Sequence, residues 1–427
     1  MNSKVNAKTG INLLIQTEGM SQVQASYRFY NNENVDFTSL NSPIIKHGLE
    51  EIEKQCDEYV LNAYDWSHLD YKHHHAKEGR VGKNKKTGQQ LGYDHQSSLT
   101  ISDITGEPIA PLAQNLKIDD SILSTYNENI DMSLTHLEEL TERTRWIRNS
   151  FDIKKEIVDI IDREGDSIAL MREYDANKWL YLIRAKNNHK VYVPTLKESL
   201  KQGELAGTLP NGAFVKSIEY QPKGKKKEQV KIYVNEIDVE LRRDATKAVI
   251  NEDGKRIIEK TAGEHIKARL VVERLINKSG EVVAQWILLT NVSKSVSSQK
   301  IATWYYYRWK IESYFKLLKS AGFNLEKWQQ QKPEAIFRRL LICSQACVLL
   351  WKLQQSNEAN AETIKKFLAK ISGRLMAWGK DYTAPALLAG LWNFLSMIDI
   401  LTIYDVDELF KMKDELSEIM GIDLGVV

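Results

Sequence analysis

The stretch 304–319 carries polar residues at a spacing suited to holding a phosphodiester. It reads Trp-Tyr-Tyr-Tyr-Arg-Trp-Lys-Ile-Glu-Ser-Tyr-Phe-Lys-Leu-Leu-Lys and lacks Pro and Gly, so we predict one helix over 305–319. At about 100° per residue, four polar side chains fall within an arc of roughly 60°. They are Tyr305, Arg308, Glu312 and Lys319. A carboxylate flanked by cations is typical of a site where Glu binds a divalent metal and the other groups hold phosphate oxygens.

The same stripe also has a plainer interpretation. The remaining face of the predicted helix is apolar and is expected to be buried. Its residues are Trp304, Trp309, Ile311, Phe315 and Leu318. An amphipathic helix of this kind often mixes Arg, Glu and Lys on its solvated side. The stripe alone therefore leaves both interpretations open.

Two aspartates stand at the ends of predicted core strands. Asp65 closes the apolar strand 59–65, and Asp162 follows the apolar strand 156–161 just before a Gly-containing turn. An Asp at the end of a core strand indicates a metal ligand. The alternative is a turn-forming Asp that only ends the strand. Together with Glu312, the two aspartates make a trio of carboxylates that can hold two divalent ions.

The elements that would position these carboxylates follow a recognisable order. Strands are predicted at 59–65, 99–102, 109–114, 156–161 and 179–185, and helices at 131–150 and 167–174. Three strands followed by helix, strand, helix and strand is the order of a ribonuclease-H-like sheet. We therefore expect an α/β fold with a mixed sheet flanked by helices, interrupted by an all-β insertion and followed by a helical C-terminal region.

Composition limits the classes of protein to consider. The 427 residues include 42% hydrophobic and 27% charged residues, which is ordinary for a soluble globular protein. The sequence shows no signal peptide and no run of membrane-span length, so a cytoplasmic protein is expected. Cys56, Cys343 and Cys347 have neither disulfide nor zinc spacing. With 59 basic against 57 acidic residues, any nucleic-acid surface must be local.

The residues as a set resemble the bacterial DDE transposases of the insertion-sequence-four family. That family has the signature Tyr-x2-Arg-x3-Glu-x6-Lys, which the stripe from Tyr305 to Lys319 matches without a gap. Three further blocks agree with it, namely Tyr27-Arg-Phe-Tyr-Asn-Asn-Glu-Asn-Val35, Asp162-Arg-Glu-Gly-Asp166 and Trp286-Ile-Leu-Leu-Thr290. These blocks are spread over most of the chain, and their ordered combination is specific.

The resemblance implies cut-and-paste transposition of DNA through a hairpin intermediate. It implies that Asp65, Asp162 and Glu312 are the catalytic residues and bind two Mg²⁺ or Mn²⁺ ions per active site. It further implies DNA-binding roles for Tyr305, Arg308, Lys319, Arg184 and Trp286, with Trp286 stacking on a flipped base. The expected partners are double-stranded DNA, as transposon ends and target, and a second copy of the chain on that DNA. No membrane is expected, and the protein would be associated with the nucleoid.

The same comparison gives the expected domains. Residues 1–55 would be a short helical region, interpreted as a possible truncated DNA-binding domain. Residues 56–188 and 287–340 would form the catalytic core, 189–286 a β-strand insertion, and 341–427 a helical region suited to dimerisation. Within the insertion, the tip 223–227 and the pair Arg242-Arg243 give a positive surface that could meet DNA or simply be solvated.

Some alternatives stay open at the level of sequence. Trp286 is also consistent with a core aromatic residue on a strand. Asp65 lies in Tyr-Asp-Trp-Ser, where related transposases more often have Asp-Thr-Thr, so the wall of the first metal site is expected to differ. A chain with a shortened N-terminus could instead be a non-catalytic inhibitor that dimerises with full-length transposase. A host nuclease built on the same sheet is a third interpretation.

Overall fold

The computed structural model describes residues 20–82, 90–127, 130–221, 226–250, 256–374, 382–423 and 425. Two compact units divide the chain. The sheet unit consists of Asn41–His68 and Arg80–Tyr314, and the helical unit of Met1–Leu40, Leu69–Gly79 and Phe315–Val427. Residues 223–225 of the predicted basic tip lie outside the described residues.

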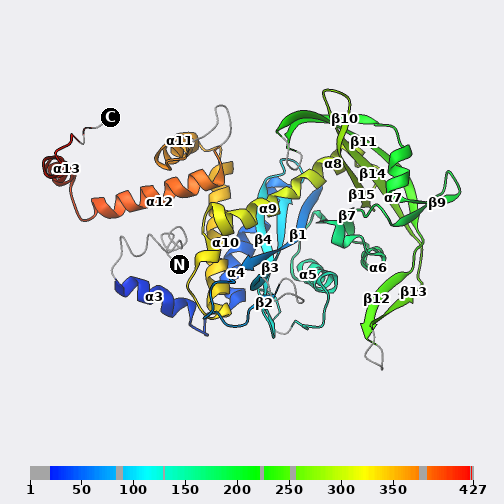
Figure 1. Ribbon diagram of the computed structural model, residues 1–427, viewed down its shortest axis with the longest axis horizontal. Helices are drawn as coiled ribbons and strands as arrows, with labels where there is room; N and C mark the ends of the chain where they lie inside the picture. The colour runs from blue at the N-terminus through cyan, green and yellow to red at the C-terminus, as the bar shows by residue number, and fades with distance from the viewer. Residues whose placement is uncertain are drawn as a thin grey trace. The chain divides into compact units, whose positions relative to one another are not determined.

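One large mixed sheet forms the centre of the sheet unit (Figure 1). Among the residues that are described, its strands follow the order β5-β4-β3-β1-β6-β7-β15-β14-β11-β8-β9, with β10 beside β11 and β2 beside β3. The strands are β1 (Tyr59–Asp70), β2 (Val81–Gly82), β3 (Leu91–Ser102), β4 (Pro108–Lys117), β5 (Ile122–Ser124), β6 (Glu156–Ile161), β7 (Leu180–Arg184), β8 (Lys190–Val193), β9 (Glu198–Lys201), β10 (Ala213–Tyr220), β11 (Glu228–Leu241), β14 (Ile266–Asn277) and β15 (Val282–Thr290). A separate two-stranded ribbon contains β12 (Ala245–Ile250) and β13 (Arg256–Thr261).

The first half of this sheet has ribonuclease-H-like topology, as predicted. Strand β1 is parallel to β6, and β6 is parallel to β7, whereas β3 and β4 run antiparallel to each other. Val158, Ile160 and Ile161 of β6 are at most 3% exposed, as expected for a central parallel strand covered on both faces. The fold class expected from the sequence is therefore confirmed.

Two helices flank the parallel strands. Helix α5 (His136–Ser150) begins five residues later than predicted, because Thr135 caps it: the Thr135 side chain accepts from the Glu138 amide, and the Glu138 side chain accepts from the Thr135 amide. Helix α6 (Ile168–Ala176) follows the turn after β6. Figure 1 shows both helices next to the parallel strands.

The predicted insertion differs in detail from an all-β segment. It contains one helix among its described residues, α7 (Gln202–Thr208), and its strand β11 runs without a break over Glu228–Leu241. Helix α8 (Ser298–Tyr307) packs against β10, β11 and β14 on one face of the sheet (Figure 1). A hairpin turn at 277–280 joins β14 to β15, and Gly280 supplies its positive φ of 86°.

The signature stretch is not one helix. Helix α8 ends at Tyr307, Arg308 is its C-cap, and α9 (Trp309–Lys316) begins at the next residue. A π-helical turn, Leu317–Ala321, then continues the chain. The break also changes the predicted buried face, since Trp309 is 62% exposed while Trp304 is fully buried.

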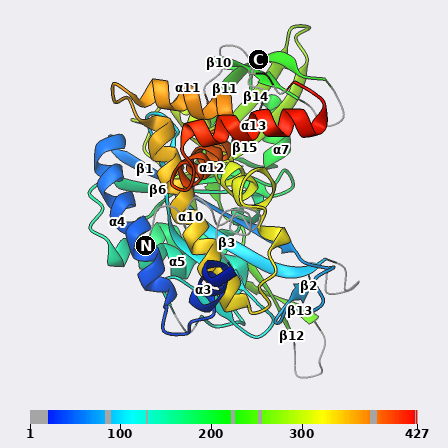
Figure 2. The ribbon, with the colours of Figure 1, turned by 90° about the vertical axis from the view of Figure 1, so that its left-hand side faces the viewer.

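The helical unit is built around α10 (Pro333–Gln355), which begins with a Pro. Its Arg338 holds the end of α3 (Met20–Tyr30): Nε donates to the Val35 carbonyl at 2.7 Å and Nη1 to the Tyr30 carbonyl at 3.0 Å. Figure 2 shows α3 beside α10. Cys343 and Cys347 are buried on α10, as expected for core residues. The unit also contains α11 (Ala361–Ile371), α12 (Ala384–Leu401), α13 (Val406–Met420) and the 3₁₀ turn Leu325–Lys327, and α4 (Phe37–Gln55) connects the two units along the chain.

Helix α12 departs from the expectation that no run of residues reaches membrane-span length. Within the described part of the chain, it is the one helix that is long and apolar enough to cross a membrane, with a mean hydropathy of 1.5 over 18 residues. Only 22% of that stretch is buried. Length and composition alone are weak evidence for a membrane span, since core helices of soluble proteins share them.

Candidate functional site

Three acidic side chains of the sheet unit lie at one edge of the sheet. In the parallel register of β1 and β6, the last paired residues are Ala63 and Ile160. Asp65 and Asp162 each lie two residues further along, so the parallel register brings them side by side. Strand β1 continues to Asp70, so Asp65 lies inside the strand and does not close it as predicted, whereas Asp162 follows the end of β6. Asp162 caps a 3₁₀ turn, Arg163–Gly165, and its Oδ1 accepts from the Glu164 amide at 2.8 Å. Glu312 reaches this edge from α9.

Arg308 connects two of these carboxylates. Its Nη1 lies 2.9 Å from Asp65 Oδ2, and its Nη2 lies 2.6 Å from Glu312 Oε1. The guanidinium therefore bridges β1 and α9, with its position fixed by the break between α8 and α9. The side chain is only 8% exposed, so this pairing operates in a poorly solvated setting where it is stronger than on an open surface. We call this arrangement the Arg308 bridge.

The carboxylates also repel one another. Burial raises the pKa of Asp65, the Arg308 charge lowers it, and the Asp162 charge raises it again. Burial likewise raises the pKa of Glu312, against the charge of Arg308, and both Asp65 and Asp162 raise it further. The net direction is upward for both groups, so one guanidinium does not fully compensate for the burial of the acidic cluster. A multivalent cation would compensate for it better.

This donor set suits a hard divalent cation in its chemistry, because all of its ligands are carboxylate oxygens. Within the described residues, however, no three His, Cys, Asp or Glu side chains are already placed to hold one ion together. In this arrangement the Arg308 guanidinium pairs with one oxygen of Asp65 and one of Glu312. The three carboxylates could hold a metal once Arg308 turns towards another anion.

Aromatic and basic side chains continue from the acidic edge across the sheet. Tyr305 is 8% exposed; burial raises its pKa, and the charges of Arg308 and Arg184 lower it. Arg184 ends β7, and its guanidinium carbon lies 6.0 Å from the centre of the Trp286 ring. The structure thus brings Tyr305, Arg308, Arg184 and Trp286 into one continuous group.

Lys319 is placed differently from the other residues of the signature. It belongs to the π-helical turn in the helical unit, and its Nζ lies 2.9 Å from Glu326 Oε1. The predicted positive surface at Arg242-Arg243 is also changed by local pairing. Arg242 lies over the Tyr192 ring and donates to Glu240, and Arg243 pairs with the buried Asp166. Both arginines therefore have partners within the protein.

The sequence did not single out a polar group beside Asp65. Trp66 donates from its indole nitrogen to Glu164 Oε2 at 3.1 Å, and His136 Nδ1 lies 3.2 Å from Glu164 Oε1. The hydrogen bond to Glu164 raises the pKa of His136, and that of Glu164 is correspondingly lowered. The group connects β1, α5 and the turn after β6. Glu164 belongs to the recognised block 162–166, but no sequence signal indicates His136, because only the fold brings it close.

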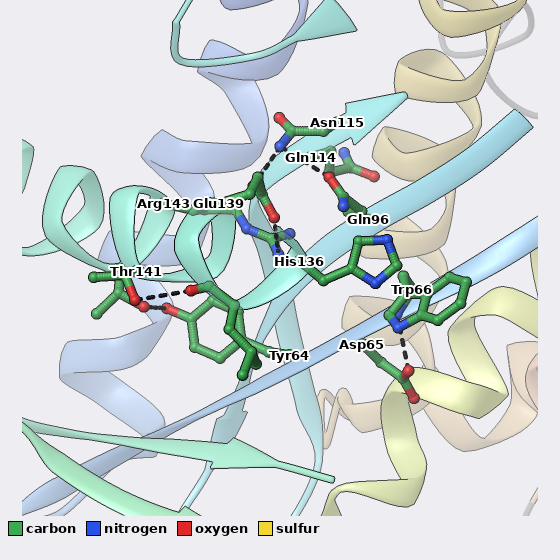
Figure 3. Close-up of polar contacts among 12 residues, drawn as sticks. Tyr64, Asp65, Trp66, Gln96, Gln114, Asn115, His136, Glu139, Thr141 and Arg143 are labelled. Atoms are coloured by element: carbon green, nitrogen blue, oxygen red, sulfur yellow. Dashed lines mark hydrogen bonds and ion pairs between the residues drawn. The ribbon is translucent and has the colours of Figure 1, made fainter. Parts of the chain in front are cut away.

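A small cavity of about 30 Å³ lies against this group. Asp65, Asp162, His136 and Glu164 line one part of it, and Glu139 and Arg143 another. Figure 3 shows His136 and Trp66 beside Asp65, with Glu139 and Arg143 on the far side of His136 from Asp65. Glu139 Oε2 accepts from Arg143 Nη2 at 3.1 Å, and Glu139 Oε1 accepts from Asn115 at 2.6 Å. Such a cavity is large enough for one or two water molecules next to the acidic edge.

Comparison with protein-family models relates the sequence to a described family. The family model described as a transposase DDE domain matches residues 134–351, which is just over half of the chain. The matched region includes Asp162 and Glu312 and the whole signature stretch; Asp65 precedes it. No curated protein matches the sequence.

Proposed function

The chain belongs to the transposase DDE domain family, and we propose that it is an insertion-sequence-four transposase that works by cut-and-paste through a DNA hairpin. Membership makes it an enzyme that cleaves DNA and transfers strands, and transposases act on DNA in the cytoplasm. The finer assignments below, including association with the nucleoid, are part of the proposal.

The observation that carries the proposal is the Arg308 bridge. A cation spans Asp65 and Glu312 at 2.9 Å and 2.6 Å, and Asp162 is close enough to raise the pKa of both. We propose that these three carboxylates are the catalytic residues and hold two Mg²⁺ or Mn²⁺ ions. Such ions, when bound, supply an activated attacking oxygen and stabilise the leaving one. The proposed role of Arg308 is to neutralise the carboxylates and hold them together until a DNA phosphate binds its guanidinium instead.

The aromatic and basic group would hold the strand end. Tyr305 can donate a hydrogen bond from its hydroxyl group to a phosphate oxygen. The guanidinium groups of Arg308 and Arg184 can each form a bidentate pair of hydrogen bonds with a phosphate. Lys319 is proposed to add a further phosphate contact. Trp286 offers a ring on which an extruded base stacks, as hairpin formation requires of a tightly bent end.

Cleavage of DNA that carries the element's ends tests this assignment. We expect Mg²⁺- or Mn²⁺-dependent nicking, followed by a product that runs as a single strand of double length on a denaturing gel. Glu312→Ala should abolish both products, and Glu219→Ala, which removes an exposed carboxylate of β10 in the same unit, should abolish neither. Persisting cleavage by Glu312→Ala would refute the catalytic assignment. Equal cleavage of random DNA would favour the host nuclease instead.

A homodimer on DNA is proposed from the exposed apolar side chains of α13. Phe410 is 51% exposed, Leu416 47% and Ile419 83%, and no residue of this helix is buried. Helix faces of this kind usually pack on a partner. The same face supports the second candidate function, an inhibitor that associates with a longer transposase. Deletion of 405–420 should abolish co-purification with such a partner, whereas tight binding to end DNA by the chain alone would count against it.

The domain division also remains a proposal. We propose 56–188 with 287–340 as the catalytic core, 189–286 as the insertion, 341–427 as the helical region and 1–55 as the N-terminal region. Limited proteolysis with identification of the fragment ends would test these boundaries.

A further inference from the structure

A buried glutamate lies next to Trp286 and has no role in the proposed chemistry. Glu273 on β14 stands opposite Trp286 on β15 in the antiparallel register, so both side chains leave the sheet on the same face. Arg184 stands opposite Leu288, two residues from Trp286, and therefore shares that face. This is the face on which α8 packs.

Glu273 is only 2% exposed. In the described part of the chain its carboxyl group makes no hydrogen bond and no ion pair, and only the more distant charges of Lys216 and Arg184 act on it. A buried polar group without a partner costs free energy, and native proteins seldom retain one without a use. The Glu273 carboxyl group thus has unused hydrogen-bonding capacity on this face of the sheet.

The surroundings of Glu273 indicate the class of ligand. The Trp286 ring is partly buried against Val230, Ile232 and Leu275, which fixes its plane. Two cations flank the pair: Arg184 lies 6.0 Å from the centre of the Trp286 ring, and Lys216 lies 4.2 Å from the centre of the Tyr306 ring. An aromatic ring, a hydrogen-bonding carboxyl group and two flanking cations match a base, its polar edge and the adjoining phosphates.

The protonation state of the carboxyl group fits this use. Burial raises the pKa of Glu273 to about 8, against the lowering effects of Lys216 and Arg184. Near neutral pH the group is then mostly a neutral acid, which offers one O–H donor and one carbonyl acceptor side by side. The edges of the four bases differ in how donors and acceptors are arranged, so such a group can tell them apart.

We propose that Glu273 and Trp286 together form a nucleobase site, in which the indole stacks on an unpaired base and the Glu273 carboxyl group hydrogen-bonds the edge of that base. The proposal rests on the proposed function, because it takes the extruded base of the hairpin step as the ligand. Its new content is that Glu273 reads the identity of that base. Glu273 would therefore determine which nucleotide is favoured at the position that leaves the helix.

The test measures binding to a labelled duplex with one unpaired nucleotide. Four versions carry adenine, cytosine, guanine or thymine at the unpaired position, and a fully paired duplex is the reference. Fluorescence anisotropy in metal-free buffer at fixed ionic strength gives each Kd without cleavage. The wild-type chain should bind at least one unpaired version more tightly than the paired duplex, and Trp286→Ala should remove that preference.

Glu273→Leu should weaken binding of the favoured unpaired version by about five- to a hundred-fold, the range expected for loss of a base-edge contact. Binding of the paired duplex should not change. Glu273→Gln keeps a neutral donor and acceptor and should change the ranking of the four bases. Glu219→Leu, an exposed position on β10, is the matched control and should behave as wild type. If Glu273→Leu does not fold by circular dichroism, Glu273→Gln decides alone through the base ranking.

Three results would overturn the proposal. They are a wild-type chain without preference for any unpaired version, Glu273 variants with wild-type ranking and affinity, and an equal loss for paired and unpaired duplexes, which would make Glu273 a structural counter-charge. The proposed function is judged separately, by whether cleavage of end-bearing DNA depends on Glu312. Glu312-dependent cleavage together with normal Glu273 variants would refute the nucleobase site and leave the transposase chemistry in place.

Discussion

At the scale of single residues, Arg308 has the most connected position in the molecule. Burial lowers its pKa, but its acidic neighbours, among them Asp65 and Glu312, together raise it by more, so the guanidinium stays charged. Removing it would leave Asp65 and Glu312 without their shared counter-charge in a partly buried setting. Loss of one member of a buried ion pair is usually costlier than loss of both.

Arg308→Ala should therefore lower the stability of the metal-free protein by about 3 kcal/mol. Added Mn²⁺ should raise the melting temperature of this variant more than that of the wild type, because the cation no longer competes with the guanidinium. Thermal melting with and without Mn²⁺ measures both effects. Arg242→Ala is the control, since its partner is the surface residue Glu240. An equal metal response in Arg308→Ala and wild type would contradict the competition.

Glu273 should make stability fall as pH rises. Its pKa is about 8 in the folded chain against an ordinary value of 4.5, so the folded state binds the proton more tightly. Between these two values, each step up in pH costs stability, and above pH 8 the loss is complete. Relative to wild type, Glu273→Gln should gain roughly 3–5 kcal/mol between pH 4.5 and pH 9. Melting temperatures across that range, with Glu219→Gln as control, measure it; parallel curves would contradict it.

At the scale of elements, the turn between β3 and β4 positions the signature segment. The indole nitrogen of Trp304 donates to the Asp103 carbonyl at 3.1 Å, and Lys310 Nζ donates to Glu107 at 3.0 Å. Gly106 lies between them with φ of 70°, and a Cβ there would come within 2.3 Å of the Tyr307 ring. One turn thus contacts both sides of the break at Arg308.

Gly106→Ala should destabilise the protein by about 2 kcal/mol and reduce cleavage, through positive-φ strain and displacement of Tyr307. Gly280→Ala is a sharp control because it has the same kind of strain, with φ of 86°, but open space around it. It should cost only about 1 kcal/mol and leave cleavage unchanged. Melting and cleavage assays on both variants separate the effect of the positive-φ strain from the effect of displacing Tyr307. Equal losses of cleavage would show that the contact with Tyr307 does not position the site.

The sequence predicted elements better than it predicted junctions. Strand β6 was placed to the residue, because its β-branched residues Ile157, Val158, Ile160 and Ile161 and the turn that follows them are local signals. The break at Arg308 was missed, since the segment contains no Gly or Pro and the tertiary contacts of Trp304 and Lys310 decide where the helix divides. His136 was missed for a related reason: its partner Glu164 lies 28 residues further along the chain, and only the sheet brings them together.

At the scale of the whole molecule, the near-neutral charge means that DNA binding must depend on a few placed cations. The chain carries 59 basic and 57 acidic residues, and many surface cations already have acidic partners. The signature itself crosses from the sheet unit into the helical unit between Tyr314 and Phe315. Each cation that contacts a phosphate should therefore contribute measurably to the dependence of DNA affinity on salt concentration.

Arg184→Ala should reduce the slope of log affinity against log salt by about one, as expected for the loss of one phosphate contact. The Kd for a fully paired duplex at several salt concentrations gives this slope. Arg242→Ala should leave it unchanged, because Glu240 and the Tyr192 ring already hold that guanidinium. A slope that is identical in all three proteins would argue against Arg184 at the DNA backbone.

The Arg308 bridge has a consequence for when the enzyme can act. Under the proposed assignment, the Arg308 guanidinium and the two metal ions compete for the same oxygens of Asp65 and Glu312. A DNA phosphate in turn competes with those carboxylates for Arg308. Each ligand then promotes the binding of the other, and this coupling must be reciprocal. The protein would bind metal weakly when it is away from DNA and more tightly once a strand end is seated. A transposase arranged in this way does not cleave host DNA at random, because its metal-loaded active site assembles only on the substrate.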